Sequence, residues 1–244
     1  MIVRLDIPPG QDNPSGREEI LRRGLPVARR GEAIVVAGEV AGPPGLVVFD
    51  LDGTLSACEF VDAIAVRRGL GHLTRELTAR AMNGEMDFSD SYTRRLEILA
   101  GTPLELVESV IRELTLAPGA AETITALKSA GVPTAIITGG YARPARAIKE
   151  RLGVDFLCAT ELEEQGGCMT GRLAGPLLDE WGKAAALGEL CAHLGIEPAR
   201  AVAVGDGAND LKMLATAGLA VLYTSLPADE RPALRMDLVL DFLL

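Results

Sequence analysis

Three short apolar runs along the chain each end abruptly in polar, glycine-rich residues. With their polar ends, they occupy 45–54 (GLVVFDLDGT), 132–140 (VPTAIITGG) and 201–210 (AVAVGDGAND). Continuous Val, Ile and Ala of this length are typical of strands buried on both faces, as in a parallel sheet covered by helices. Helical patterns lie around these strands at 120–130, 143–152 and 181–194. This alternation predicts an α/β fold with a doubly wound, Rossmann-like parallel sheet.

The segment 58–115 interrupts the alternation. It carries many charged residues in helix-period patterns and shows no strand pattern. We therefore predict an insertion of about four helices after the first core strand, which forms a cap over the strand ends. The core domain would then comprise 45–57 and 116–244. Within it, 162–173 (LEEQGGCMTGRL) has two central glycines and predicts a β-hairpin.

The first 44 residues have the weakest pattern. The stretch 8–16 (PPGQDNPSG) is rich in turn-forming residues, and 32–40 (EAIVVAGEV) could form one strand. We interpret 1–44 as an N-terminal extension of unknown role.

Composition and charge narrow the classes of function. The 244 residues are 48% hydrophobic, which is enough for one substantial core. The formal net charge of −10 disfavours binding to nucleic acids or anionic membranes, because both require a basic surface. A small anionic substrate needs only a few cations in a cleft, so that class remains. No apolar run approaches the roughly 20 residues of a membrane helix, and no secretory signal pattern is present, so we expect a cytoplasmic protein.

Two carboxylates follow the first predicted strand, at Asp50 and Asp52 of the sequence DLDGT. In an extended chain both side chains point to the same side, where they repel each other unless a cation or a proton is present. A hard divalent ion with oxygen ligands, such as Mg²⁺, meets that requirement. Taken alone, the motif also fits an ordinary Asp-Gly turn.

The third predicted strand ends in Asp206, Asn209 and Asp210 of the sequence GDGAND. Ligand sites of doubly wound sheets lie beyond the carboxyl ends of the strands, so these acids are expected to meet the first pair. Two acidic strand ends at one edge of a sheet predict a metal site.

Two further features are weak signals when taken singly. Thr138 and Gly139 end the second predicted strand, where a glycine-rich turn exposes N–H groups that can bind phosphate, although a plain turn fits as well. Lys183 lies on a predicted helix and would be an ordinary surface residue unless that helix reaches the strand ends. There it could neutralise phosphoryl oxygens.

In this order, the four motifs resemble the haloacid dehalogenase superfamily of phosphohydrolases over about 46–222. The resemblance implies that Asp50 attacks phosphorus and forms an aspartyl-phosphate, and that Asp52 is the general acid and base. It implies that Mg²⁺ is held by the side chains of Asp50 and Asp206 and by the backbone carbonyl of Asp52. Asp210 would bind the ion or support the site. The residues implied to bind the phosphoryl oxygens are Thr138, Gly139, Lys183 and Asn209.

Within that superfamily, the cap is similar to that of phosphoserine phosphatases. Glu59 follows the nucleophile at the family's spacing, and 80–99 (RAMNGEMDFSDSYTRRLEIL) resembles the family's second cap segment. The resemblance implies that Glu59 pairs with the ammonium group of phosphoserine and Arg95 with its carboxylate, between apolar walls formed by Met82 and Phe88. If the resemblance is set aside, Met82 and Phe88 also fit ordinary helix packing. Glu59 and Arg95 then also fit a solvated surface of the cap or an ion pair within it.

Three features depart from the family pattern. Thr138 stands where Ser is usual, and Ala184 follows Lys183 where Gly is more usual. The C-terminal segment 233–244 (ALRMDLVLDFLL) is compressed relative to the family's usual ending.

Together these features predict a Mg²⁺-dependent phosphoserine phosphatase that catalyses the last step of serine biosynthesis. Its partner would be a small phosphomonoester, with no nucleic acid and no membrane, and homodimer formation is left open. One alternative is a related enzyme that acts on phosphothreonine, phosphoethanolamine or a sugar phosphate, or transfers phosphate to an alcohol such as homoserine. Another is a non-catalytic sensor of phospho-amino acids.

Overall fold

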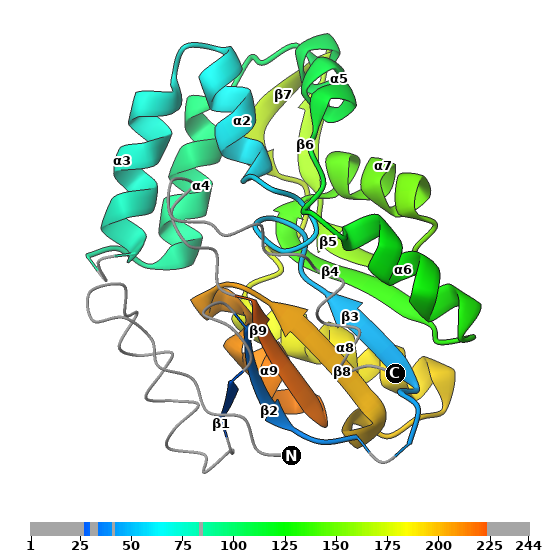
Figure 1. The fold of residues 1–244 in the computed structure, drawn as a ribbon. Coiled ribbons are helices and arrows are strands. Elements are labelled where there is room, and N and C mark those ends of the chain that lie inside the picture. The colour runs from blue at the N-terminus through cyan, green and yellow to red at the C-terminus, as the bar shows by residue number, and fades with distance from the viewer. Residues whose placement is uncertain (1–26, 30–33, 41, 83–84, 224–244) are drawn as a thin grey trace.

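The computed structural model describes residues 27–29, 34–40, 42–82 and 85–223. At its centre is a seven-stranded sheet in the order β1-β2-β9-β8-β3-β4-β5 (Figure 1). The strands are β1 (Val27–Arg29), β2 (Ile34–Gly38), β3 (Leu46–Phe49), β4 (Thr134–Tyr141), β5 (Phe156–Thr160), β8 (Ala201–Gly205) and β9 (Leu219–Tyr223). Five neighbouring strands, from β9 to β5, are parallel, which confirms the predicted α/β class.

The sheet is larger than the sequence pattern indicates. The three predicted strands are β3, β4 and β8, but β5 and β9 also join the parallel sheet. Beyond β9, the strands β2 and β1 add in antiparallel orientation, so the sheet is mixed and not wholly parallel. The strand expected within 32–40 is β2, and part of the segment interpreted as a separate extension therefore belongs to the core sheet. The turn-rich stretch 8–16 and the segment 233–244 lie outside the described residues.

Helices cover both faces of the sheet. They are α6 (Ala120–Ser129), α7 (Ala142–Leu152), α8 (Glu180–Leu194) and α9 (Leu211–Thr216), with short 3₁₀ turns at Pro198–Arg200 and Ala208–Asp210. Side chains of β3 alternate between two apolar clusters: Val47 and Phe49 pack in the cluster that contains residues of α6 and α7. Leu46 and Val48 pack in the cluster that contains residues of α8 and α9. This alternation explains why the strands are apolar throughout.

The predicted cap of about four helices is confirmed. Its helices are α2 (Phe60–Arg67), α3 (Gly71–Met82), α4 (Phe88–Ile98) and α5 (Leu104–Glu113). They follow β3 directly and form a separate layer beyond one end of the sheet (Figure 1).

The predicted hairpin is also present, as β6 (Leu162–Gln165) and β7 (Cys168–Leu173). Its turn consists of Gly166 and Gly167, whose φ values of 59° and 77° are readily adopted only by glycine. Backbone hydrogen bonds fasten the hairpin to the loop between α4 and α5: Gly101 N donates to Met169 O at 2.8 Å, and Leu104 N to Gly167 O at 2.8 Å. The hairpin thus joins the cap to the core.

Within the part of the chain that the structure describes, no helix combines the length and the apolar character that crossing a bilayer requires.

Candidate active site

The end of β3 leads from the sheet into the cap. Asp50 follows the last strand residue and is almost fully buried, and its backbone N–H still bonds the sheet at Val204 O, 2.8 Å away. Two residues later, Asp52 Oδ1 accepts from the backbone N–H of Phe60, the first residue of α2, at 3.2 Å. One short segment therefore places two carboxylates between the core and the cap, as expected for side chains two residues apart.

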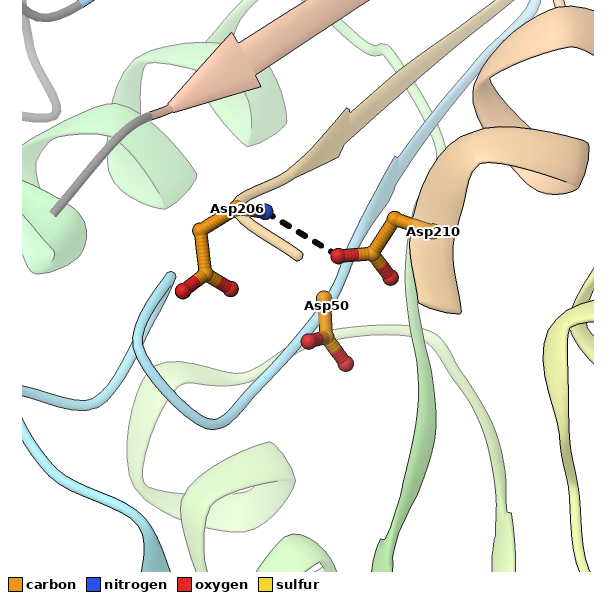
Figure 2. Close-up of side chains that lie close together, drawn as sticks. All are labelled: Asp50, Asp206 and Asp210. Carbon is orange, nitrogen blue, oxygen red and sulfur yellow. Dashed lines mark hydrogen bonds between the residues drawn. The ribbon is translucent and has the colours of Figure 1, made fainter. Parts of the chain in front are cut away.

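The end of β8 supplies a second pair of carboxylates. Asp210 is fully buried, and its Oδ2 accepts from the backbone N–H of Asp206 at 3.0 Å (Figure 2). The same oxygen accepts from the backbone N–H of Gly207 at 2.9 Å. Asp206 Oδ1 accepts from the hydroxyl of Thr54 at 3.1 Å. Asp206 is thus held by the turn after β3, which connects the two strand ends.

Asp50, Asp206 and Asp210 form one cluster. Each offers a carboxylate oxygen, and the three oxygens lie within 4.8 Å of one another. Figure 2 shows the three side chains converging from β3 and from the turn after β8. Burial, and next the charge of Asp210, raises the pKa of Asp50 to about 7. Burial, and then the charges of Asp210 and Asp50, also raise the pKa of Asp206.

This donor set fits a divalent cation. All three candidate ligands are carboxylate oxygens, which suit a hard ion such as Mg²⁺. Burial and the neighbouring carboxylates raise the pKa values of Asp50 and Asp206, and a divalent ion would offset both effects. The position of the Asp206 side chain depends on Gly53, because a Cβ there would lie 2.3 Å from Asp206 Oδ2.

Lys183 lies at the centre of the cluster. It is fully buried, and its Nζ donates to Asp50 Oδ1 at 2.8 Å and to Asp210 Oδ1 at 2.7 Å. Burial by itself would lower the pKa of this lysine, but the carboxylates of Asp210 and Asp50 outweigh burial and raise it. The lysine is therefore charged at neutral pH. The Ala184 that follows it does not prevent these contacts.

The helix α8 brings this lysine to the strand ends. Its N-cap is Asp179, whose Oδ1 accepts from the backbone N–H groups of Trp181 at 3.0 Å and Gly182 at 2.8 Å. Lys183 lies one turn further along the helix.

The end of β4 approaches Asp52. Thr138 is buried, and its Oγ1 accepts from the backbone N–H of Gly140 at 2.9 Å. A Cβ on Gly140 would lie 2.5 Å from Asp52 Oδ2, and one on Gly139 would lie 2.8 Å from Leu178 O, so both positions require glycine. The sequence pattern ended the strand at 140, whereas β4 continues to Tyr141 with an irregularity in its pairing after Thr138.

Asn209 lies in the 3₁₀ turn that carries Asp210. A Cβ on Gly207 would meet Asn209 Oδ1 at 2.2 Å, so the asparagine side chain folds back over this turn.

The cap places Arg95 and Glu59 together. Arg95 is buried in α4, and its NH1 is 3.3 Å from Glu59 Oε2 and 3.6 Å from Asp62 Oδ2. Phe88 begins α4 and stacks on Tyr92, with 6.1 Å between ring centroids. The side chain of Met82 lies outside the described part of the structure. The ion pair within the cap, left open by the sequence, is therefore present.

Asp52 lies between the carboxylate cluster at the strand ends and the charged residues of the cap. Burial raises its pKa well above the ordinary value, and the charges of Glu59 and Asp50 add to that effect. A carboxyl group whose pKa is raised keeps its proton to a higher pH than usual, which suits the role of an acid.

Sequence reasoning did not identify three residues near these groups. Thr54 is part of the DLDGT motif, and Asp62 stands one helical turn after Glu59. Tyr92 lies four residues after Phe88 and three before Arg95, so helical spacing on α4 could have grouped it with them.

Comparisons with known proteins place the chain among its relatives. Residues 47–215 match the family model of haloacid dehalogenase-like hydrolases. The phosphoserine phosphatase SerB2 of Mycobacterium tuberculosis is 37% identical over 230 residues, which cover 93% of this chain and 55% of that protein. The phosphoserine phosphatase of Idiomarina loihiensis is 40% identical over 184 residues, which cover 75% of this chain and 84% of that protein.

A solved structure extends the likeness to three dimensions. It is described as a phospho-aspartyl intermediate analogue of phosphoserine phosphatase and superposes with a TM-score of 0.68 at 38% identity. The match covers 72% of this chain and 84% of that one. The chain spans about half the length of several curated relatives that it matches.

Proposed function

We propose, since the chain belongs to the haloacid dehalogenase-like hydrolases and within them to the phosphoserine phosphatase family, that it hydrolyses O-phospho-L-serine to L-serine and phosphate. The observation that carries the proposal is the buried contact of Lys183 Nζ with both Asp50 and Asp210, 2.8 Å and 2.7 Å away, beside Asp206. Such a cluster suits an anionic group that is transferred next to a cation.

Two carboxyl groups would divide the chemistry. Asp50 attacks phosphorus in line with the leaving oxygen, which produces an aspartyl-phosphate. Asp52, whose pKa is raised by burial, donates its proton to the departing serine oxygen. It then takes a proton from the water that hydrolyses the aspartyl-phosphate. A solved structure of a phosphoserine phosphatase described as a phospho-aspartyl intermediate analogue supports this sequence of steps.

The cluster would hold Mg²⁺. Both oxygens of Asp210 already accept hydrogen bonds, Oδ1 from Lys183 and Oδ2 from two backbone N–H groups. We therefore assign Asp50, Asp206 and the backbone carbonyl of Asp52 as its ligands, with Asp210 supporting the site. When bound, Mg²⁺ would neutralise charge on the phosphoryl group and on the carboxylates.

The phosphoryl oxygens would be bound by groups from two strand ends and from helix α8. Lys183 supplies a fixed charge, and Thr138 and Gly139 supply donors at the end of β4. Asn209 completes the set from the turn after β8. All four face charge that is redistributed during transfer, which is where hydrogen-bond donors accelerate the reaction.

The cap, 58–115, would select the substrate. Glu59 pairs with the ammonium group of phosphoserine, and the buried guanidinium of Arg95 pairs with its carboxylate. Phe88 would exclude water from these charges, and the resemblance to the family predicts the same role for Met82. The ion pair between Glu59 and Arg95 supports this arrangement, because a zwitterionic substrate offers each residue a replacement partner of the correct sign.

The experiment is phosphate release from five substrates, with Mg²⁺ and with EDTA. The panel contains phosphoserine, phosphothreonine, phosphoethanolamine, a sugar phosphate and an aryl phosphate, with and without an added acceptor alcohol such as homoserine. We expect a clear preference for phosphoserine that is lost in EDTA. Equal rates across the panel would contradict the substrate assignment, and phosphorylated acceptor would indicate transfer. Tight binding of phosphoserine without turnover would indicate a sensor.

A further inference from the structure

Among the described residues, buried side-chain nitrogen or oxygen atoms without a hydrogen-bond partner are concentrated in the cap. The atoms are Asp62 Oδ1, Tyr92 Oη, Arg95 Nε and Thr123 Oγ1. Three of these four belong to neighbours: Asp62 Oδ2 lies 3.6 Å from Arg95 NH1, and the Arg95 guanidinium carbon lies 5.5 Å from the centroid of the Tyr92 ring. Buried polar atoms normally have hydrogen-bond partners, so several neighbouring atoms without one suggest that a ligand binds there.

The position of Tyr92 is fixed by its neighbours on α4. Its ring is 2% exposed and is stacked on Phe88 at an interplanar angle of 21°. Arg95 also lies within cation–π distance of the same ring. The hydroxyl lies in the plane of the ring, so a fixed ring gives it a fixed direction.

The hydroxyl belongs to the same buried region as the reactive carboxylates. Burial raises the pKa of Tyr92, and the charge of Asp52 raises it further, with a smaller effect of Glu59. Tyr92 is therefore neutral and carries a proton that it can donate. Asp52 joins this region to the strand ends through its hydrogen bond with Phe60.

The unpaired atoms suit a particular ligand. Arg95 NH1 is shared by Glu59 and Asp62, which leaves Nε as a donor without a partner. Together with the Tyr92 hydroxyl, this gives two donors three residues apart on one helix, one for each oxygen of a carboxylate. The third atom, Asp62 Oδ1, is an acceptor and suits an ammonium group. An α-amino acid carries both groups.

We propose that Tyr92 is a further substrate-binding residue, whose hydroxyl donates to one carboxylate oxygen of the substrate while Arg95 Nε–H donates to the other. This inference rests on the proposed function and deepens it: the site requires an α-carboxylate beside the phosphoryl-bearing carbon. Tyr92 then determines specificity for phospho-amino acids over phosphorylated amines that have no carboxylate.

The test compares two substrates that differ in the carboxylate. Tyr92→Phe removes only the hydroxyl, and Thr123→Val is the matched control, because it removes the other unpaired buried hydroxyl, in α6 of the core. Steady-state kinetics are measured with O-phospho-L-serine and with O-phosphoethanolamine. For Tyr92→Phe we expect kcat/KM for phosphoserine to fall about tenfold, mainly through KM, since one hydrogen bond to a charged group is lost. The value for phosphoethanolamine should change by less than about twofold, as should both values in Thr123→Val.

The outcomes separate this inference from the proposed function. If wild type prefers phosphoserine and Tyr92→Phe keeps the same ratio between the two substrates, Tyr92 does not bind the carboxylate. An equal loss of kcat on both substrates would also overturn the inference, because it would place the hydroxyl at Asp52 or at the leaving oxygen. If wild type shows no preference for phosphoserine, both proposals fail. Should Tyr92→Phe not fold, Tyr92→Leu offers the same comparison, with thermal denaturation as the check of folding.

Discussion

Asp50, Asp52 and Asp210 are the same type of side chain in three environments. Asp210 has both oxygens engaged by Lys183 and backbone N–H groups. Asp50 shares the lysine but is buried beside another carboxylate, and burial raises its pKa to about 7. For Asp52, burial and then the charge of Glu59 raise the pKa well above its ordinary value. These environments allow three aspartates to take the different roles proposed for them: Asp210 supports the metal site, Asp50 is the nucleophile and Asp52 is the acid.

Asp50→Asn should abolish hydrolysis and leave the fold intact. The amide occupies the same volume but cannot form the covalent intermediate, so kcat should fall by about 10⁴-fold or more. Phosphate release from phosphoserine measures the loss, and circular dichroism with thermal denaturation checks the fold. Asp90→Asn, at an exposed position of α4, is the control. Activity near that of wild type would exclude Asp50 as the nucleophile.

Arg95→Ala should affect phosphoserine far more than an aryl phosphate. Removal of the buried guanidinium takes away the proposed partner of the carboxylate, so kcat/KM for phosphoserine should fall about 100-fold. The aryl phosphate has no carboxylate and should lose much less. Arg94→Ala removes an exposed arginine next to it on α4 and should change neither value. An equal loss on both substrates would mean that Arg95 supports the cap rather than the substrate.

At the scale of elements, the start of α8 governs the position of the central lysine. Asp179 caps the helix through two backbone N–H groups, and Lys183 N donates to Asp179 O at 2.8 Å in the first turn. The lysine is therefore placed by the first turn of a capped helix, where fraying would move it.

Asp179→Ala should lower both stability and activity. Loss of an N-cap side chain costs about 1 kcal/mol of the free energy of unfolding. Because the first turn also carries Lys183, kcat should fall several-fold. Asp179→Ser keeps a capping oxygen and should restore most of both quantities. Urea denaturation and steady-state kinetics are the measurements. A stability loss without any change in kcat would show that the cap does not position the lysine.

At the scale of the whole molecule, the sheet brings distant segments to one edge. The parallel neighbours β8, β3 and β4 end at the site, and the cap follows β3 directly. Without a metal ion, burial of several carboxylates around Lys183 at this edge opposes folding, so the stability of the chain should depend on metal and on pH. Cytoplasmic location and homodimer formation stay predictions.

Mg²⁺ should raise the Tm more at pH 8 than at pH 6. The pKa of Asp50 rises from its ordinary value in the unfolded chain, about 3.9, to about 7 in the metal-free fold. A raised carboxyl pKa means that its favourable contribution is present at low pH and is lost as the pH rises through 7. Mg²⁺ offsets this loss and competes with fewer protons at pH 8. Thermal denaturation with Mg²⁺ and with EDTA at both pH values measures the effect, and equal shifts would contradict it.

The sequence by itself determined the α/β class, the cap and the hairpin, because each depends on local periodicity or on glycine chemistry. Apolar runs marked β3, β4 and β8, and Gly166 and Gly167 marked the hairpin turn. Ordered motifs also indicated the family to which the chain belongs. By contrast, β5 and β9 escape prediction because neither strand leads directly into a polar, glycine-rich stretch. No local pattern shows that β2 pairs with β9, a strand far away in the sequence.

Only the tertiary structure decided which side chains meet. Spacing indicated Lys183 as a candidate, but its burial between Asp50 and Asp210 depends on α8 packing behind the sheet. The same holds for Tyr92, whose sequence position is equally compatible with simple packing. Its unpaired hydroxyl became visible only when α2 and α4 were placed together. Periodicity is a local property of the chain, whereas burial and electrostatic coupling depend on distances between segments that the sequence does not contain.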